Sequence, residues 1–399
     1  MDCATSDELA LEWGRQVPAG SAETRREVPR RASDQQSGAM DSQQRGVGRT
    51  VKIAIIAGDG IGQDVTREAV KVLAAIEGRF GVSLTLEHLP WSADHYLKTG
   101  VTLPPDGYDL LRQFDAVFIG ALGDPRVPDN RHARDILLGT RFELDLYINY
   151  RPVRLLDERL CPLKGRTPAD VNFSVFRENT EGLYVGVGGR FKPGTEDEVA
   201  IQEEVNTWKG VHRIIRHAFE FARGRGLKRV CMADKSNAMT AGHALWQRVF
   251  HELAPAYPEI AATHYYIDAL AMYMVLDPGQ FEVIVTNNLF GDIVTDLAAT
   301  FQGGLGMAAS GNIHPGRTSM FEPVHGSAPK FAGKNIANPI GAIASAALML
   351  ETLGLAREAA AIDDAVLATV KDNQVTQDIG GSLGTREAGD AIVRRIQQS

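Results

Sequence analysis

Three aspartates in two short segments have the residue type and spacing of a divalent metal site. Asp268 ends the run YID, and 24 residues later Asp292 and Asp296 stand in the run FGDIVTD. If the second run is helical, side chains four residues apart lie on one face of the helix, and three carboxylates can converge. Carboxylate oxygens suit Mg²⁺ or Mn²⁺, which keep positions open for water and substrate. The sequence therefore predicts a magnesium or manganese site at these residues.

Two acids at helical spacing also occur on solvated helix faces, and the neighbourhood of Asp292 and Asp296 argues against that alternative. The pair stands between the apolar run 281–285 and the glycine-rich run 303–306. A helix face next to core strands is not normally left with unpaired charge. We therefore favour the metal site over the solvated face.

Three arginines lie in otherwise apolar or strand-like segments. Arg141 and Arg151 belong to RFELDLYINYRP, and Arg177 to VNFSVFRENTEGLY. A guanidinium group is costly to bury unless it meets an anion, and its fork binds carboxylates through two hydrogen bonds. Each arginine taken singly could form a structural ion pair. Together they predict a ligand with more than one carboxylate.

Two more segments carry polar groups at the ends of expected elements. Lys235, in DKSN, follows a strand-like run, which is where α/β proteins keep site residues, although an isolated lysine there is also compatible with a surface position. The stretch FEPVHGSAP at 321–329 has no regular period and offers free backbone N–H groups. It would suit the phosphates and adenine of a nucleotide, and an ordinary loop is the alternative.

The elements that position these residues are those of an α/β protein. The turn GDGIG at 58–62 lacks GxGxxG spacing and is not a Rossmann fingerprint. The glycine-rich stretch 185–202 predicts an extended arm or hairpin, with a plain surface loop as the alternative. Apolar runs predict strands at 51–56, 116–120, 171–176, 229–233 and 281–286, and periodic patterns predict helices from Ile61 to about Ile76 and around 209–224, 240–254 and 340–353.

Composition excludes several classes of protein. The 399 residues are 44% hydrophobic and 23% charged, as in ordinary globular proteins. A net charge of −8 with no strongly basic stretch excludes a nucleic-acid surface, and no apolar stretch approaches the length of a membrane span. Three scattered cysteines without a CxxC indicate a reducing cytoplasm. The composition of residues 1–50 predicts a disordered leader. The alternative is that the start of the protein is assigned too early and that the native chain begins at Met40.

From Lys52 to about Gly381 the chain resembles the β-decarboxylating dehydrogenases of 2-hydroxy acids, the family of isopropylmalate, isocitrate, homoisocitrate and tartrate dehydrogenases. The resemblance implies an isopropylmalate-dehydrogenase-like α/β fold of two domains with a large mixed sheet. A discontinuous cofactor-binding domain would comprise 51–146 and 304–399, and 147–303 would carry the metal site, the dimer interface and the arm. The resemblance rests on GDGIG, R-x9-RP, RENTEGLY (177–184), DKSN (234–237), YIDALAMY (266–273), NLFGDIVTD (288–296), EPVHGSAP (322–329) and Asn338-Pro339.

The resemblance also implies roles for individual residues in a homodimer with shared active sites. The three arginines would clamp the malate carboxylates, Asp268 would reach the metal from the other subunit, and Lys235, also from that subunit, would take the hydroxyl proton as hydride leaves C2. Tyr184 would protonate the enolate that remains after CO₂ departs. Asn149 is expected near the substrate and Asn237 near the nicotinamide. The residues expected to bind the rest of the cofactor are Ile61, His325, Gly326, Ser327, Ala328, Lys330 and Asn338.

The substrate depends on the residues just before Arg141. Leu137 and Leu138 are similar to the apolar contact that isopropylmalate enzymes offer to an isopropyl group, and an apolar wall would leave the extra carboxylate of isocitrate unpaired. We therefore predict 3-isopropylmalate. Arg134 stands where those enzymes usually have Glu, and RENTEGLY stands where they usually read RELTGGIYFG. The segments WSADHYLKTG, DPRVPDN and GGRFKPGTEDEVAIQEE resemble tartrate dehydrogenases, which also carry a Leu-Leu pair before the arginine. Tartrate or D-malate stays open as the alternative, followed by isocitrate or homoisocitrate.

Residues near the cofactor segment differ in the cofactor that they favour. Lys330 and Phe331 resemble the Lys-Tyr pair of enzymes that use NADP, and a lysine favours a 2′-phosphate. The Tyr and Arg that those enzymes add near the C-terminus correspond to Gln377 and Gly381, so we predict NAD and keep NADP open. A non-catalytic regulatory subunit, or a metal- and anion-binding protein without redox function, is disfavoured because every expected ligand and the lysine are present.

Overall fold

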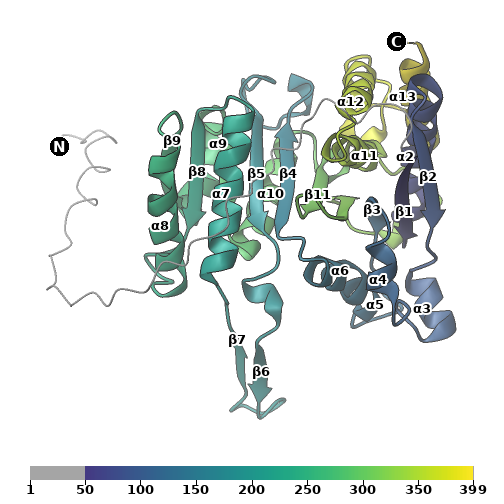
Figure 1. Ribbon diagram of the computed structural model, residues 1–399. Helices are drawn as coiled ribbons and strands as arrows, with labels where there is room; N and C mark the ends of the chain where they lie inside the picture. The colour runs from purple at the N-terminus through teal and green to yellow at the C-terminus, as the bar shows by residue number, and fades with distance from the viewer. Residues whose placement is uncertain (1–49, 399) are drawn as a thin grey trace, which may run out of the picture. The chain divides into compact units, whose positions relative to one another are not determined.

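The computed structural model describes residues 50–398, and a ten-stranded mixed sheet forms its centre (Figure 1). The leader predicted at 1–50 lies, up to residue 49, outside the described residues. In the order in which they pair, the strands are β2 (Ser83–His88), β1 (Thr50–Gly58), β3 (Ala116–Ala121), β12 (Ser319–Pro323), β11 (Ala309–Ile313), β4 (Ile148–Arg154), β5 (Asn172–Glu178), β10 (Val283–Thr286), β8 (Arg229–Asp234) and β9 (Ala261–Tyr266).

Helices connect these strands. The α-helices are α2 (Ile61–Phe80), α3 (Ala93–Thr99), α4 (Gly107–Leu111), α5 (Arg131–Ala133), α6 (Gly139–Glu143), α7 (Trp208–Gly224), α8 (Gly242–Leu253), α9 (Ile267–Leu276), α10 (Asn288–Phe301), α11 (Ile340–Thr352), α12 (Ala356–Lys371) and α13 (Thr385–Gln398). A π-helical turn, η1 (Arg134–Leu138), joins α5 to α6. The other single turns are of 3₁₀ type. Each predicted strand and helix is confirmed, with small shifts at its ends.

The sheet consists of two parallel blocks that run in opposite directions. Strands β2, β1, β3 and β12 are parallel to one another, and so are β5, β10, β8 and β9. Between the blocks, β11 and β4 are antiparallel to each other and to their outer neighbours. This confirms the large mixed sheet expected in place of a Rossmann fold. The division into a discontinuous domain of 51–146 and 304–399 and a second domain of 147–303 stays a prediction.

Local sequence explains why these elements form. In β1, the β-branched run Ile53 to Ile56 has no exposed surface, as expected for a strand covered on both faces. In α7, Thr207 caps the N-terminus by accepting a hydrogen bond from Gly210 N at 3.0 Å. Apolar residues three and four apart along α7, beginning at Val211, give it one buried face.

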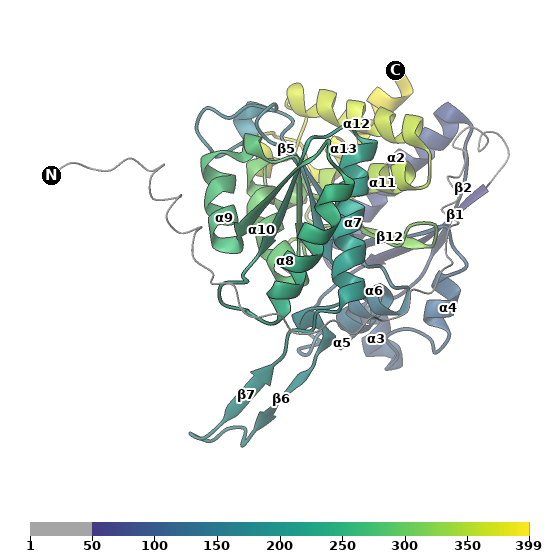
Figure 2. The ribbon, with the colours of Figure 1, turned by 60° about the vertical axis from the view of Figure 1, so that its left-hand side comes forward.

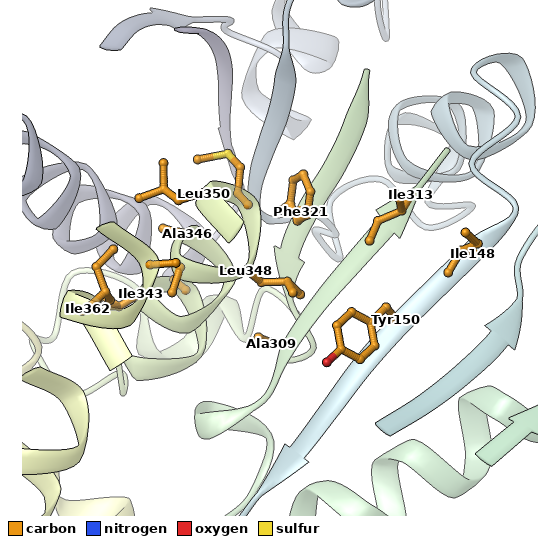
Figure 3. Close-up of a cluster of buried hydrophobic side chains, with 14 of the residues drawn as sticks. Ile148, Tyr150, Ala309, Ile313, Phe321, Ile343, Ala346, Leu348, Leu350 and Ile362 are labelled. Carbon is orange, nitrogen blue, oxygen red and sulfur yellow. The ribbon is translucent and has the colours of Figure 1, made fainter. Parts of the chain in front are cut away.

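One face of the sheet is covered by a continuous apolar layer that contains residues of α2, α7, α8, α11, α12 and α13. Figure 3 shows Leu348 of α11 beside Phe321 and Tyr150 of the sheet, and Ile343 of α11 beside Ile362 of α12. Each fully buried side chain of this size stabilises the fold by about 1.5 to 3 kcal/mol. This layer packs against strands of both blocks and against β11 and β4 between them.

The opposite face carries two separate apolar clusters. One contains Leu270 of α9 and Val294 of α10 and lies over β5, β10 and β8. The other contains Leu111 and Ile136 and lies over β1 and β3. Figure 2 shows strands of the sheet running between α9 and α10 on one side and α7 on the other. The middle strands β12, β11 and β4 carry polar side chains on this face, between the two clusters.

A hairpin of β6 (Gly188–Phe191) and β7 (Val199–Gln202) projects away from the large sheet (Figures 1 and 2). This confirms the extended arm predicted at 185–202. None of the helices between residues 50 and 398 has the length and apolarity that a membrane crossing requires.

Candidate active site

Alternation along the middle strands separates apolar from polar side chains. On β4, Tyr150 faces the continuous apolar layer, so its neighbours Asn149 and Arg151 face the other side. Asn149 pairs across the sheet with Arg177 of β5 and with Asn312 of β11. The site is therefore built on the middle of the sheet, in the gap between the two apolar clusters.

The three predicted arginines gather in this gap and are almost fully buried, with 6% exposure for Arg141, 8% for Arg151 and 1% for Arg177. Arg141 donates to Glu322 Oε1 at 2.9 Å, and Arg177 donates through Nε to Asn288 Oδ1 at 2.8 Å and through Nη1 to Asp292. The burial that the sequence predicted for these three arginines is confirmed.

Arg151 lies against α10. It donates to Thr295 Oγ1 at 2.5 Å and to Asp292 Oδ1 at 3.3 Å, and its Nη1 lies 3.5 Å from Asp296 Oδ1. The helical spacing predicted for the two aspartates is thus confirmed, since both carboxylates reach the same guanidinium group.

The charges of the site perturb one another. Burial, and after it the neighbouring Arg151, lowers the pKa of Arg177 to about 10. Burial would raise the pKa of Asp292, but the charges of Arg177 and Arg151 outweigh it and lower that pKa. At Asp296 burial prevails, and the pKa is raised. A bound dicarboxylate would offset the repulsion between the neighbouring charges of Arg177 and Arg151.

Two observations test whether a divalent cation fits here. Asp292 and Asp296 offer only carboxylate oxygens, and their side chains are 39% and 60% exposed, so a cation can reach them. The three guanidinium charges are balanced by Asp292, Asp296 and Glu322, which leaves a cation and a dianionic ligand to balance each other. The residues present therefore fit Mg²⁺ or Mn²⁺.

Asp268 does not join the other two aspartates within one chain. Its Oδ1 lies 2.7 Å from Lys235 Nζ, which follows β8. Between residues 50 and 398, no group of three His, Cys, Asp or Glu side chains could hold a metal ion. A complete three-aspartate site would therefore require Asp268 from another copy of the chain.

Tyr184 completes the polar cluster around Asp292. Its hydroxyl donates to Asp292 Oδ2 at 2.9 Å, and Arg177 lies 5.1 Å from the centre of its ring. Burial raises the pKa of Tyr184, and the nearby Arg177 only partly offsets this. The hydroxyl therefore keeps its proton at neutral pH, as a proton donor must.

The predicted cofactor segment packs against the glycine turn after β1. Ile61 N donates to Ser327 O at 2.7 Å, and Ser327 Oγ donates to Gly123 O at 2.5 Å. Gly60 has φ +53°, and a Cβ there would come within 2.0 Å of Ser327 O, so only glycine permits this approach. A hollow of about 420 Å³ opens beside the turn and is lined in part by Gly326, Ser327 and Ala328.

The remaining predicted cofactor residues are spread around this segment. His325 Nε2 is buried without a hydrogen-bond partner among the described residues, and burial lowers the pKa of the ring. Asn338 donates to Asp378 Oδ2 at 3.0 Å. Lys330 and Asn237 are exposed. The structure thus brings Ile61 together with Ser327 but gives Asn237 no such contact.

The predicted substrate residues differ in their exposure. Leu137 and Leu138 are half-buried in the π-helical turn, a distortion that often marks functional sites. Asn149 is fully buried and donates to Ser310 Oγ and Asn312 Oδ1, both at 2.9 Å. Asn149 therefore connects β4 to β11 beneath the arginines, on the strands that form the floor of the site.

Sequence reasoning missed several residues of the site. Glu322 stands in EPVHGSAP, but nothing in its spacing marks it as the partner of Arg141. Asp59, in the glycine turn, accepts hydrogen bonds from Ala93 N, Gly123 N and His132 Nε2 at 2.7 to 2.8 Å. An acidic residue between two glycines after a buried strand could have indicated that several loops are hydrogen-bonded to this turn.

Comparison with known proteins gives consistent matches. The family model for isocitrate/isopropylmalate dehydrogenase matches residues 52–392. A 3-isopropylmalate dehydrogenase of Thermobifida fusca is 45% identical over 88% of this chain and 99% of its own length. A decarboxylating D-malate dehydrogenase of Escherichia coli is 43% identical over 87% of this chain and 99% of its own length.

Solved structures agree with these matches. The crystal structure of isocitrate dehydrogenase from Methylococcus capsulatus has a TM-score of 0.79 and 38% identity, covering 87% of this chain and all of that one. The TT0538 protein from Thermus thermophilus has a TM-score of 0.77 and 35% identity, covering 87% of this chain and 68% of that one.

Proposed function

The chain belongs to the isocitrate/isopropylmalate dehydrogenase family and is an oxidoreductase, and we propose that it oxidises and decarboxylates 3-isopropylmalate with NAD as the hydride acceptor. The observation that carries this proposal is the burial of Arg141, Arg151 and Arg177 beside two aspartates one helical turn apart. Three buried guanidinium groups and a cation site fit a substrate with two carboxylates and a hydroxyl group.

The arginines bind and orient the substrate. Arg151 and Arg177 lie on neighbouring strands, and Arg141 approaches from α6. Together they hold both carboxylates so that C2 faces the nicotinamide, which removes the entropic cost of finding that geometry during the reaction. Bound Mg²⁺ or Mn²⁺ would supply Lewis-acid polarisation of the C2 oxygen.

Lys235 and Tyr184 move the protons. In the proposed reaction, Lys235 of the partner subunit takes the C2 hydroxyl proton, and bound NAD would supply the acceptor for the hydride that C2 loses. The carboxylate on C3 then leaves as CO₂, and the electrons of the broken bond remain as an enolate. Tyr184 donates its proton to C3. Its position beside Arg177 and Asp292 supports this role.

The homodimer is part of the proposal. The separation of Asp268 from Asp292 and Asp296 within one chain supports a site completed by a second copy. Exposed apolar side chains on α9 and α10, among them Met272, Leu276 and Ile293, support an interface there. A cytoplasmic location is also proposed, supported by the free thiols of Cys161 and Cys231.

A panel of substrates tests the proposal. NAD(P)H formation at 340 nm is measured with isopropylmalate, isocitrate, homoisocitrate, tartrate and D-malate, each with NAD or NADP and with Mg²⁺ or Mn²⁺. The highest kcat/KM is expected for isopropylmalate with NAD. Activity should disappear with EDTA and return with the metal, and Asp296→Asn should need more metal. No NAD(P)H from any of the five acids contradicts the proposal.

D-malate or tartrate is the second candidate. The motif RENTEGLY at 177–184 and the similarity to the Escherichia coli D-malate enzyme favour it. The same panel separates the two candidates, because an apolar wall at Leu138 should favour the isopropyl group over a hydrogen or a hydroxyl at C3. The exposed Lys330 similarly makes NADP the alternative cofactor.

A further inference from the structure

Three hydrogen bonds hold the main chain at and beside Lys235. The side chain of Asp234 accepts a hydrogen bond from Ser236 N at 3.0 Å, and the Lys235 carbonyl accepts one from Met239 N at 2.8 Å. The N–H of Lys235 itself donates to His243 Nδ1 at 2.7 Å. The last contact is the only one of the three that depends on the side chain of a distant element, α8.

His243 is fully buried, and its contacts define its protonation state. A backbone N–H can only donate, so Nδ1 must accept, and the hydrogen of the neutral imidazole is on Nε2. Nε2 lies 3.2 Å from Glu204 Oε1, which can accept it. The side chain of Glu204 is only 7% exposed. The two side chains therefore form a chain of hydrogen bonds that ends at Lys235.

Glu204 also contacts the helix that carries the metal aspartates. Its Oε1 accepts a hydrogen bond from Asn287 Nδ2 at 2.7 Å, and Asn287 caps α10 by accepting from Phe290 N at 2.9 Å. The ring of Phe290 meets His243 edge-on, with 5.5 Å between ring centres. One carboxylate, just after the arm, thus connects the Lys235 loop to the start of α10.

We propose that His243 and Glu204 are positioning residues for Lys235, and this inference rests on the proposed function. Neither residue is among those proposed to contact the substrate. The imidazole fixes the main chain from which the lysine extends, and Glu204 holds the imidazole in the required tautomer. Without this support the side-chain amine of Lys235 samples positions away from the C2 hydroxyl, and a displacement of about 1 Å lowers the rate roughly a hundredfold. Substrate binding by the arginines should change little.

Two substitutions at one position separate positioning from packing. In His243→Asn the amide oxygen occupies the place of Nδ1 and can accept from Lys235 N. In His243→Gln the longer side chain reaches the place of Nε2 and cannot. We expect kcat of His243→Gln to fall roughly a hundredfold, that of His243→Asn to stay within a few-fold of wild type, and KM for the acid to change little in both. The matched control is His251→Asn, at an exposed histidine of the same helix.

Hydrogen exchange at the Lys235 amide provides a readout that does not need activity. Mass spectrometry should show this amide protected in the wild-type dimer and in His243→Asn, and exchanging faster in His243→Gln. If His243→Gln does not fold, Glu204→Met, which cannot accept from Nε2, must show the same loss of protection.

Equal kcat values for His243→Gln and His243→Asn, or unchanged protection at Lys235, would overturn the inference. Failure of the proposed function would be seen separately, as a wild-type protein that reduces no NAD(P) with any of the five acids while its Lys235 amide is protected.

Discussion

Gly291 of α10 lies directly against the side chain of Arg177, and a Cβ at position 291 would come within 2.6 Å of both Cβ and Cγ of the arginine. Arg177 is 1% exposed and cannot move aside into solvent. The absence of a side chain at Gly291 therefore allows the helix that carries Asp292 to pack against the strand that carries Arg177.

Gly291→Ala should lower both stability and activity. In an open helix interior, alanine in place of glycine stabilises a protein by about 1 kcal/mol. Here the added methyl group must displace Arg177 or α10, so we expect the sign to reverse and KM for the acid to rise. The matched control is Gly78→Ala in α2, where nothing lies within 4 Å of the added Cβ. Urea unfolding and steady-state kinetics measure both, and a Gly291→Ala protein as stable as Gly78→Ala contradicts the expectation.

Arg177→Lys should weaken substrate use although it keeps the charge. Arg177 contacts Asn288 and Asp292 through different nitrogens, and the single ammonium group of lysine cannot replace both contacts. Losing one partner of a buried, charged hydrogen bond costs about 2 to 3 kcal/mol, or roughly a hundredfold in kcat/KM. Arg154→Lys, in a surface pair with Asp363, is the control and should change kcat/KM little. Comparable values for the two variants would argue against a substrate role for Arg177.

Much of the framework was predictable because strongly apolar segments form it. The runs that became β1, β5, β8 and β10 consist mainly of apolar residues and are bounded by polar or glycine-rich residues. In contrast, β11 and β12 were not predicted. They alternate apolar residues with Ser310, Asn312 and Glu322, which form the hydrogen-bonded floor of the site, and this alternation resembles a loop when it is read without its partners.

The site was predictable where residue chemistry itself limits the options, as with three arginines in apolar surroundings. It was not predictable where a residue acts through contacts between distant segments. His243 and Glu204 are 39 residues apart and meet only because the arm returns to the sheet beside α8. The π-helical turn at Leu137 and Leu138 also lacks a sequence signal, because its pattern of apolar residues matches that of an α-helix.

A mixed dimer tests whether Lys235 acts across the subunit interface. Lys235→Ala and Tyr184→Ala homodimers should each be inactive. If Lys235 serves the partner's site, a heterodimer of the two variants contains one site with both wild-type residues, and about half of the wild-type activity per dimer should return. Differently tagged subunits, purified for both tags, provide the sample. Heterodimers that form but stay inactive would place both residues in one subunit's site.

Glu178 should make stability depend on pH. Burial, and after it the charge of Glu181, raises the pKa of Glu178 from its ordinary 4.5 to about 7. Between these values the folded chain keeps a proton that the unfolded chain has released, so the free energy of unfolding falls as pH rises, by about 3 kcal/mol in total. In Glu178→Gln the side chain cannot ionise, so the free energy of unfolding does not fall for this reason as pH rises. Wild-type stability relative to the variant should therefore fall between about pH 4.5 and pH 7 in urea unfolding.

The hydrogen bonds at Glu178 act in the opposite direction and limit the size of that effect. The carboxylate accepts from Thr180 N at 3.0 Å and from Glu181 N at 2.7 Å, and both contacts favour ionisation. Because burial outweighs them, the net slope stays negative. The same substitution at the exposed Glu259 controls for the removal of a carboxyl group. A difference between wild type and Glu178→Gln that is constant or grows with pH would mean that the two backbone N–H groups, rather than burial, determine the ionisation of Glu178.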